Sequence, residues 1–229
     1  MLSREVLADG ALGDDAGIGD GLLRLAALMA RLRRDCPWDA EQTHRSLAKH
    51  LIEETAETVD AIEAGSDADL IEELGDVLLQ VMFHAEIGRT EGRFDIDTVA
   101  DGIVEKLIAR HPFVFADDAV PADMMATWEG AKQLEKHRAS ALDGIAESLP
   151  TLARASKVAT RLRDTHTTVA PPLDAGDDDA AVVGRCLLGD VIQAVQAGID
   201  PDQALRDATR EWERAVRLAE DRSAPNDTD

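Results

Sequence analysis

The sequence predicts an all-α protein, and three observations support this prediction. Ala, Leu, Glu, Asp and Arg dominate the 229 residues, a composition that favours helices. No stretch shows the alternation of β-branched and polar residues that is typical of a half-buried strand. Apolar residues instead recur at helical spacing in segments that end at Gly or Pro. We therefore expect a succession of helices.

The first expected helix spans about residues 21–34, because five apolar residues recur there at helical spacing: Leu22, Leu25, Leu28, Met29 and Leu32. Pro37 then interrupts the pattern within the segment Cys36-Pro37-Trp38-Asp39. Residues 1–20, which are rich in Gly and Asp, are expected to be a flexible N-terminal segment.

Two long helices are expected to form a helical hairpin in the first half of the chain. The pattern predicts helices over about residues 43–64 and 67–91. Gly65 should end the first of them, and Ser66 or Asp67 should cap the second. Because the connection is so short, we expect the two helices to lie antiparallel.

Five further helices are expected near residues 97–110, 122–138, 150–163, 181–197 and 201–221. His111-Pro112 should stop the first of these, because a proline disfavours helix at the residue before it. Residues 165–180 are rich in Pro, Gly and Asp and are expected to be a flexible linker. We expect residues 222–229 to be a disordered tail.

Charge and cysteine usage exclude several classes of function. The formal net charge is −22, so the chain should repel nucleic-acid polymers and anionic membrane surfaces. The two cysteines lie far apart in the sequence and form no metal-binding pattern, which is typical of reduced thiols in the cytoplasm. We expect neither a secretory leader nor a membrane-spanning segment, and hence a cytoplasmic protein.

The second hairpin helix has an unusual distribution of polar residues. Its apolar residues cover nearly the whole circumference, as in a buried helix, yet Glu73, Asp76, Gln80 and His84 form a narrow polar strip. Burying bare carboxylates is costly unless a cation compensates them. Glu54 and Glu57 on the preceding helix would complete a set of four carboxylates, which suits Mg²⁺ or Mn²⁺. His84 is expected to be a hydrogen-bonded helix residue beside this strip.

A solvated acidic face is the simpler interpretation of the first hairpin helix, since 46 of the 229 residues are acidic. The spacing of Glu73 and Asp76 on an otherwise apolar helix favours the metal site. A non-catalytic acidic helical module that binds a partner protein is the alternative from another functional class.

The motifs as a group resemble the MazG family of nucleoside triphosphate pyrophosphohydrolases. The family pattern EExxE followed by ExxD reads here as Glu53-Glu54-Thr55-Ala56-Glu57 and Glu73-Leu74-Gly75-Asp76. Similar motifs occur at Cys36-Pro37-Trp38-Asp39, at Glu91-Gly92-Arg93-Phe94 and at His111-Pro112-x-Val114-Phe115. The resemblance covers about residues 20–165.

This resemblance implies an all-α NTP pyrophosphatase that hydrolyses nucleoside triphosphates, with Mg²⁺ as cofactor and Mn²⁺ as a substitute. It implies that Glu54, Glu57, Glu73 and Asp76 are the metal ligands, and that Glu53 is a nearby carboxylate or the base for water. A related hydrolase with a diphosphate or a narrow damaged-nucleotide substrate is a second alternative.

The resemblance also implies substrate-binding pairs around the nucleotide. Lys106 with Arg110 would neutralise phosphate oxygens, and Trp128 with Lys132 would contact the base or sugar and the phosphates. Both pairs have i,i+4 spacing, so their members share a helix face. The alternative is that the cations are solvated and Trp128 belongs to the core. Trp38 either lines the site or anchors the core.

The C-terminal part resembles a degenerate second copy of the same domain. Leu188-Gly189-Asp190-Val191-Ile192 is similar to Leu74-Gly75-Asp76-Val77-Leu78, but Leu187 replaces the first acid and no EExxE precedes it. We therefore expect a catalytic domain over residues 21–164 and an inactive copy over residues 181–221.

A homodimer is expected from the apolar surface of the second hairpin helix. Leu79 and Phe83 lie opposite its main apolar side and need a neighbour. In MazG-like folds two hairpins pair into a four-helix bundle. Since the second copy here has lost its ligand helix, another molecule is expected to supply the partner hairpin.

Overall fold

The computed structural model describes residues 19–115, 119–120, 139–167, 169–170 and 178–223. Every regular element within these ranges is a helix, so the all-α prediction is confirmed. The chain divides into two compact units, Met1–Trp128 and Glu129–Asp229, and each is described by itself.

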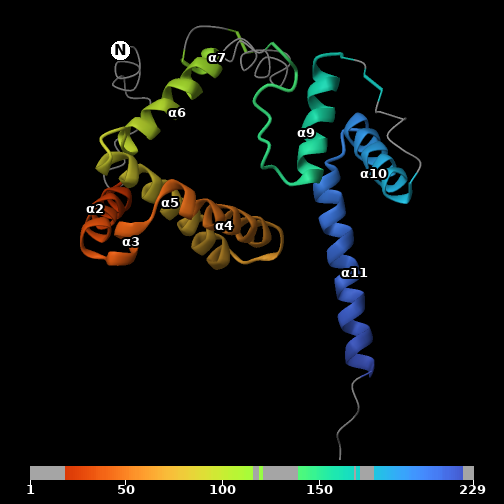
Figure 1. Cartoon of the computed structure of the whole chain (residues 1–229), viewed down its shortest axis with the longest axis horizontal. Coiled ribbons are helices and arrows are strands. Elements are labelled where there is room, and N and C mark those ends of the chain that lie inside the picture. The colour runs from red at the N-terminus through yellow and green to blue at the C-terminus, as the bar shows by residue number, and fades with distance from the viewer. Residues whose placement is uncertain (1–18, 116–118, 121–138, 168, 171–177, 224–229) are drawn as a thin grey trace, which may run out of the picture. The chain divides into compact units, whose positions relative to one another are not determined.

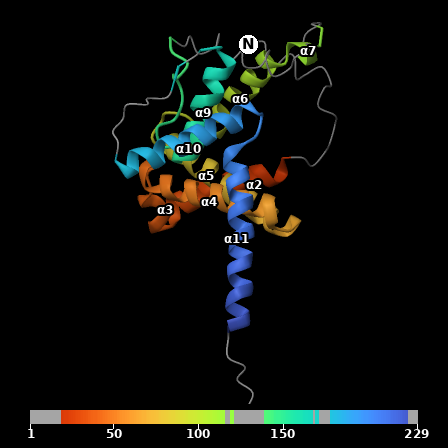
Figure 2. The same cartoon turned by 90° about the vertical axis from the view of Figure 1, so that its right-hand side faces the viewer.

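The first unit is built around a long helical hairpin. Its helices within the described residues are α2 (Asp20–Asp35), α3 (Pro37–Glu41), α4 (His44–Ala64), α5 (Asp67–Thr90), α6 (Ile96–Arg110) and α7 (Pro112–Phe115). Helices α4 and α5 lie side by side along much of their length (Figure 1 and Figure 2). Helix α2 packs on α5 and α3, and α6 contacts α5 and α7. The expected hairpin is confirmed.

Local sequence signals explain where the hairpin helices begin and end. Thr43 caps α4 and Ser66 caps α5, each in a reciprocal capping box with the residue three positions on. Gly65 ends α4, and a Cβ atom at that position would lie 2.8 Å from the backbone of Ala61. Only glycine therefore fits this tight connection, as the sequence pattern predicts.

The core of the first unit lies where α2 crosses the open end of the hairpin. Its buried residues are Met29 of α2, Leu47 of α4, and Met82, Phe83 and Ile87 of α5. Leu79 packs against the same cluster. The expectation that Leu79 and Phe83 need a neighbouring molecule is therefore wrong, because α2 of the same chain covers them.

Two short helices differ from the sequence-based expectations. Pro37 does not simply interrupt the chain, because it occupies the first turn of α3, where its missing N–H group costs no hydrogen bond. Pro112 likewise begins α7 immediately after His111, which ends α6. The expected helix over residues 122–138 lies outside the described residues.

The second unit contains α9 (Thr151–Asp164), α10 (Asp179–Gln196) and α11 (Pro201–Ser223) among its described residues. Ala159 of α9 packs against Val191 and Val195 of α10 to form a small core. Helix α10 begins at Asp179, two residues before the expected start at residue 181, and Asp178 caps it. Helix α11 reaches Ser223, so the first two residues of the expected tail, 222 and 223, are helical, and the rest of that tail lies outside the described residues.

The structure and the sequence analysis differ in where they group α9. The sequence analysis places residues 150–163 with the catalytic domain, whereas α9 packs against α10 and α11 within the second unit. The physical reason is that the apolar face of α9 is covered by Val191, Ile192 and Val195. The extent of the catalytic domain itself stays a prediction.

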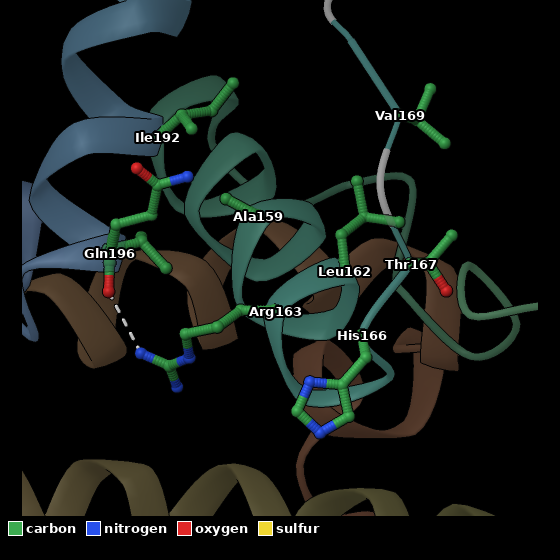
Figure 3. A pocket seen from close by; sticks show the side chains of 9 residues that line it. Ala159, Leu162, Arg163, His166, Thr167, Val169, Ile192 and Gln196 are labelled. Carbon is green, nitrogen blue, oxygen red and sulfur yellow. Dashed lines mark hydrogen bonds between the residues drawn. The ribbon is translucent and has the colours of Figure 1, made fainter.

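A cavity of about 330 Å³ lies between α9 and α10 in the second unit (Figure 3). Arg163, at the end of α9, donates a hydrogen bond of 3.0 Å to the main-chain oxygen of Val195 beside this cavity. The lining contains no carboxylate: it consists of Ala159, Leu162, Arg163, His166, Thr167, Val169, Ile192, Val195 and Gln196. It is therefore not a site for a hard divalent cation.

Within the described ranges, no single helix has both the length and the hydropathy required to cross a membrane. Helices α10 and α11 meet those criteria only when taken together, and the pair is bent by 113°.

Candidate functional site

Three of the predicted metal ligands lie close together in the middle of the hairpin. One carboxylate oxygen from each of Glu54, Glu57 and Glu73 can be chosen so that all lie within 4.8 Å of one another. Glu54 and Glu57 are one turn apart on α4, and Glu73 faces them from α5. Thr58 is buried beside them and places its hydroxyl 3.4 Å from the main-chain oxygen of Glu73.

Desolvation and the mutual repulsion of negative charges both raise carboxylate pKa values in this cluster. Partial burial, followed by the charges of Asp76, Glu57 and Glu53, raises the pKa of Glu54. Partial desolvation, followed by the charges of Glu57 and Asp76, raises the pKa of Glu73. Asp76 therefore lies close enough to act on both groups, although it is not one of the three carboxylates within 4.8 Å.

The donor set fits a hard divalent cation. Each group offers carboxylate oxygen, and a positive charge between like charges at this separation stabilises their ionised forms. Gln80, one helical turn beyond Asp76, is also buried, and its amide oxygen has no hydrogen-bond partner among the described residues. That oxygen is available to accept a hydrogen bond from a water molecule or ligand.

Glu53 lies on α4 beside the cluster and is exposed. Its carboxylate oxygen is 3.6 Å from Nδ1 of His50, one turn earlier on the same helix. Its charge contributes to the raised pKa of Glu54. Glu53 is therefore near the carboxylate cluster while being open to water.

The predicted substrate-binding residues are placed in different ways. Lys106 is exposed and Arg110 is half-buried on α6, the helix that contacts α5 and α7. Trp38 lies on α3 and is 54% exposed, with its ring edge-to-face against Phe83 at a centroid distance of 6.2 Å. Trp38 thus combines a core contact with an accessible face. Trp128 and Lys132 lie outside the described residues.

A histidine contact at the open end of the hairpin was not predicted. His44, the first residue of α4, lies with its Nδ1 atom 2.7 Å from Nδ1 of His84 on α5. The expectation that His84 is a hydrogen-bonded helix residue is confirmed. His44 as its partner follows only from the antiparallel register of the two helices, which residue types alone do not give.

The second unit lacks an equivalent carboxylate cluster among its described residues. Leu187, which replaces the first acid of the ExxD motif, is largely exposed, and Asp190 is exposed on α10. The partner of α10 is α9, which carries four basic residues: Arg154, Lys157, Arg161 and Arg163. This pairing is chemically unlike the α4–α5 hairpin.

Comparison with known proteins identifies the same segment. Residues 42–115, which include α4, α5 and α6, match the family model of the MazG nucleotide pyrophosphohydrolase domain. The chain is 37% identical over 226 residues to a nucleoside triphosphate pyrophosphohydrolase of Escherichia coli K12, with 86% of each chain covered.

Two further relatives cover different amounts of the chain. An uncharacterized 26.1 kDa protein of Streptomyces cacaoi is 44% identical over 207 residues, covering 88% of this chain and 84% of its own. The crystal structure of a mazG-related protein from Thermotoga maritima is 26% identical and covers 48% of this chain and 98% of its own, with a TM-score of 0.43. The similarity to the Escherichia coli enzyme extends over most of both chains, and this chain belongs to the MazG family of nucleoside triphosphate pyrophosphohydrolases.

Proposed function

We propose that this protein is a Mg²⁺-dependent hydrolase that converts a ribo- or deoxyribonucleoside triphosphate into the monophosphate and pyrophosphate. The observation that supports the proposal best is the cluster of Glu54, Glu57 and Glu73 on two helices of the hairpin. Family membership supports the reaction class, and the fit of the carboxylates to a hard cation supports Mg²⁺, with Mn²⁺ as a substitute.

Glu54, Glu57, Glu73 and Asp76 would hold the cation. A bound Mg²⁺ would neutralise phosphate oxygens and lower the pKa of a water molecule beside the α-phosphorus. The acidic chain has a formal net charge of −22, so its carboxylates alone would repel the anionic substrate.

The chain's own residues then carry the proton and position the substrate. Glu53 accepts a proton from the attacking water, whose oxygen bonds to the α-phosphorus. The bond from that phosphorus to the oxygen bridging to the β-phosphate breaks, and pyrophosphate leaves with the electron pair. Lys106 and Arg110 neutralise phosphate oxygens, and Trp38, Trp128 and Lys132 complete the substrate-binding set.

The homodimer remains part of this proposal, but on different grounds from those of the sequence analysis. Four large apolar residues of the hairpin are at least half exposed in the single chain: Ile52, Ile62, Ile71 and Leu74. An apolar surface of this kind on two adjacent helices is typical of a subunit interface. Pairing of two hairpins would bury it in a four-helix bundle. A cytoplasmic location is likewise proposed.

The test is a panel of ribo- and deoxyribonucleoside triphosphates and diphosphates, with release of pyrophosphate or phosphate measured with and without Mg²⁺. Wild-type protein should release pyrophosphate only with the metal, and Glu57→Gln should lose this activity. Glu41→Gln, an exposed charge change at the end of α3, is the matched control and should behave as wild type. Absence of pyrophosphate release from every triphosphate with Mg²⁺ or Mn²⁺ would contradict the proposal.

A further inference from the structure

The open end of the α4–α5 hairpin is closed by a direct contact between two imidazole rings. The Nδ1 atoms of His44 and His84 are 2.7 Å apart, the ring centroids are 5.0 Å apart and the interplanar angle is 6°. Face-to-face stacking would not bring two nitrogens so much closer than the centroids. The rings therefore lie edge to edge in nearly one plane, which is the geometry of an N–H···N hydrogen bond.

A third residue determines which nitrogen carries each hydrogen. Nη2 of Arg93, in the segment after α5, lies 2.6 Å from Nε2 of His44. Because a guanidinium only donates, Nε2 of His44 must accept, and neutral His44 carries its hydrogen on Nδ1. That hydrogen is donated to Nδ1 of His84, so His84 carries its own hydrogen on Nε2.

This arrangement leaves no place for an additional proton. The basic nitrogen of His84 already faces the N–H of His44, and the basic nitrogen of His44 already faces the N–H of Arg93. Protonating either ring would put two donors against each other and break one contact. Burial, followed by the charge of His44, lowers the pKa of His84 in the same sense.

The charged groups on the surrounding elements do not offer either histidine ring another hydrogen-bond acceptor. Glu91 forms an ion pair with Arg93 and so holds the guanidinium near His44. Phe94 packs on His44 at a centroid distance of 6.0 Å. The other charged groups nearby belong to other contacts: Arg33 of α2 lies over the Phe83 ring, and Asp95 before α6 acts on Arg89.

We propose that His44 and His84 are positioning residues for the reaction, forming a clamp that holds α4 and α5 in the register that brings Glu54, Glu57 and Glu73 together. The proposal rests on the proposed function of those carboxylates. The clamp works only while both rings are neutral, so acid opens it. Neither histidine needs to touch the substrate.

The position of the clamp explains why it matters to the carboxylates. The contacts His44–His84 and Thr58–Glu73 fit one antiparallel register, and the Gly65–Ser66 connection fixes the other end of the hairpin. The carboxylate cluster lies between these two ends, about 15 Å along α4 from His44. Its mutual repulsion pushes the helices apart, and the two fixed ends oppose that push.

The first experiment measures the hydrogens directly in full-length protein with ¹⁵N-labelled histidine. At pH 8 we expect a signal from a hydrogen on Nδ1 that is lost in the spectrum of a His44 variant, whereas the Nδ1 hydrogen of His111, which is donated to the main-chain oxygen of Leu107, should remain. We expect His84 to carry its hydrogen on Nε2. Because burial lowers the pKa of His84 from the ordinary histidine value of 6.5, its signal should keep the neutral form at pH 6.5 and change only at lower pH. Hydrogens on Nε2 of both rings at pH 8, or a His84 that is already mostly protonated at pH 6.5, would overturn the clamp.

The second experiment tests positioning with two variants of His84. His84→Asn keeps a neutral acceptor near the position of Nδ1, and His84→Lys places a permanent positive charge there. Affinity for Mg²⁺ is read from the rise in melting temperature with Mg²⁺ concentration, which needs no substrate. His84→Lys should bind Mg²⁺ roughly tenfold more weakly at pH 8 or worse, since misplaced ligands lose their geometry. His84→Asn should bind as wild type does.

Pyrophosphate release should follow the same order at pH 8, and the loss of activity between pH 6.5 and pH 5.5 should be smaller in His84→Asn than in wild type. His166→Asn, in the second unit, is the matched control and should leave both profiles unchanged. If His84→Lys binds Mg²⁺ as tightly as wild type does, the pair does not position the carboxylates. Inactivity of wild-type protein with normal Mg²⁺ binding would instead refute the proposed reaction.

Discussion

The charge of Asp76, like that of Glu57, acts on carboxylates from both helices of the hairpin. It raises the pKa of Glu54 on α4 and of Glu73 on α5. A group in this position repels its neighbours when no cation is present and helps to hold a cation when one is present. Its removal should therefore have opposite effects on activity and on the stability of the metal-free protein.

Asp76→Asn should lower pyrophosphate release by roughly a hundredfold or more, as expected for loss of a group that acts on developing charge. Without metal, the variant should unfold at the same or a higher temperature than wild type, because one repelling charge is gone. The measurements are steady-state kinetics with Mg²⁺ and calorimetry in a chelator. Asp101→Asn, an exposed position on α6, is the control. Marked destabilisation without metal would mean that Asp76 has a structural role.

Helix α5 carries the carboxylates in its first half and the core residues in its second half, and the two halves tolerate change differently. Residues 80–88 are mostly buried, whereas the first turns are largely exposed. Gly88 lies in the buried half, where a Cβ atom would come within 2.7 Å of the Phe94 ring and 2.8 Å of its main-chain oxygen. The chain after α5 therefore returns closely across the helix at this glycine.

Gly88→Ala should destabilise the protein by about 1–3 kcal/mol, because the added methyl group forces Phe94 and its backbone to move. Gly102→Ala in α6 is the matched control, because a Cβ atom there meets nothing within 4 Å. The control should stabilise the protein by about 0.5–1 kcal/mol through better helix propensity. Urea unfolding measures both. Equal effects of the two substitutions would contradict the close approach of Phe94.

Helix ends could be predicted from the sequence because their causes are local. Gly65 and Ser66 give the hairpin connection from residue type alone. The short helix α3 does not follow from residue type alone, because a proline both breaks a helix and fits its first turn.

The carboxylates of the candidate site were also predictable, because Glu54, Glu57 and Glu73 stand at helical spacing in a recognisable pattern. The covering of Phe83 by α2 and the contact between His44 and His84 were not. Both depend on how separate helices dock, and the period of a single helix carries no such information.

The division of the molecule into two units bears on which part is needed for activity. Every proposed site residue except Lys132 belongs to the first unit, and Lys132 itself precedes α9, which packs with α10 and α11. A chain ending at Asp164 would keep all the proposed site residues and remove the partners of α9. Its Ala159 would then lose the contacts with Val191 and Val195.

Truncation after Asp164 should leave pyrophosphate release within about threefold of wild type, while α9 loses helicity because an isolated helix of its length is marginal in water. Activity and far-ultraviolet circular dichroism measure the two effects. Complete loss of activity in a truncated chain that remains folded and assembled would mean that residues after Asp164 contribute to the site.

The oligomeric state is a second property of the whole molecule. If Ile52, Ile62, Ile71 and Leu74 form a subunit interface, the protein should have twice the mass of the 24.7 kDa chain. Light scattering after size exclusion at low micromolar concentration, with and without Mg²⁺, measures it. Ile71→Glu should yield monomer, whereas Leu218→Glu on α11 should not. An active wild-type protein with the mass of one chain in both conditions would exclude the dimer.

The two units also have separate optical reporters. The chain contains no tyrosine and three tryptophans, of which Trp38 lies in the first unit beside Phe83 and Trp212 lies 72% exposed on α11 of the second. Unfolding of the first unit should therefore shift the emission of Trp38 to longer wavelength, while Trp212 starts close to the wavelength of a solvated indole. Fluorescence would follow mainly the first unit, whereas circular dichroism would follow the helices of both. If the two curves do not coincide, the units lose structure independently, and each unit then has its own free energy of unfolding.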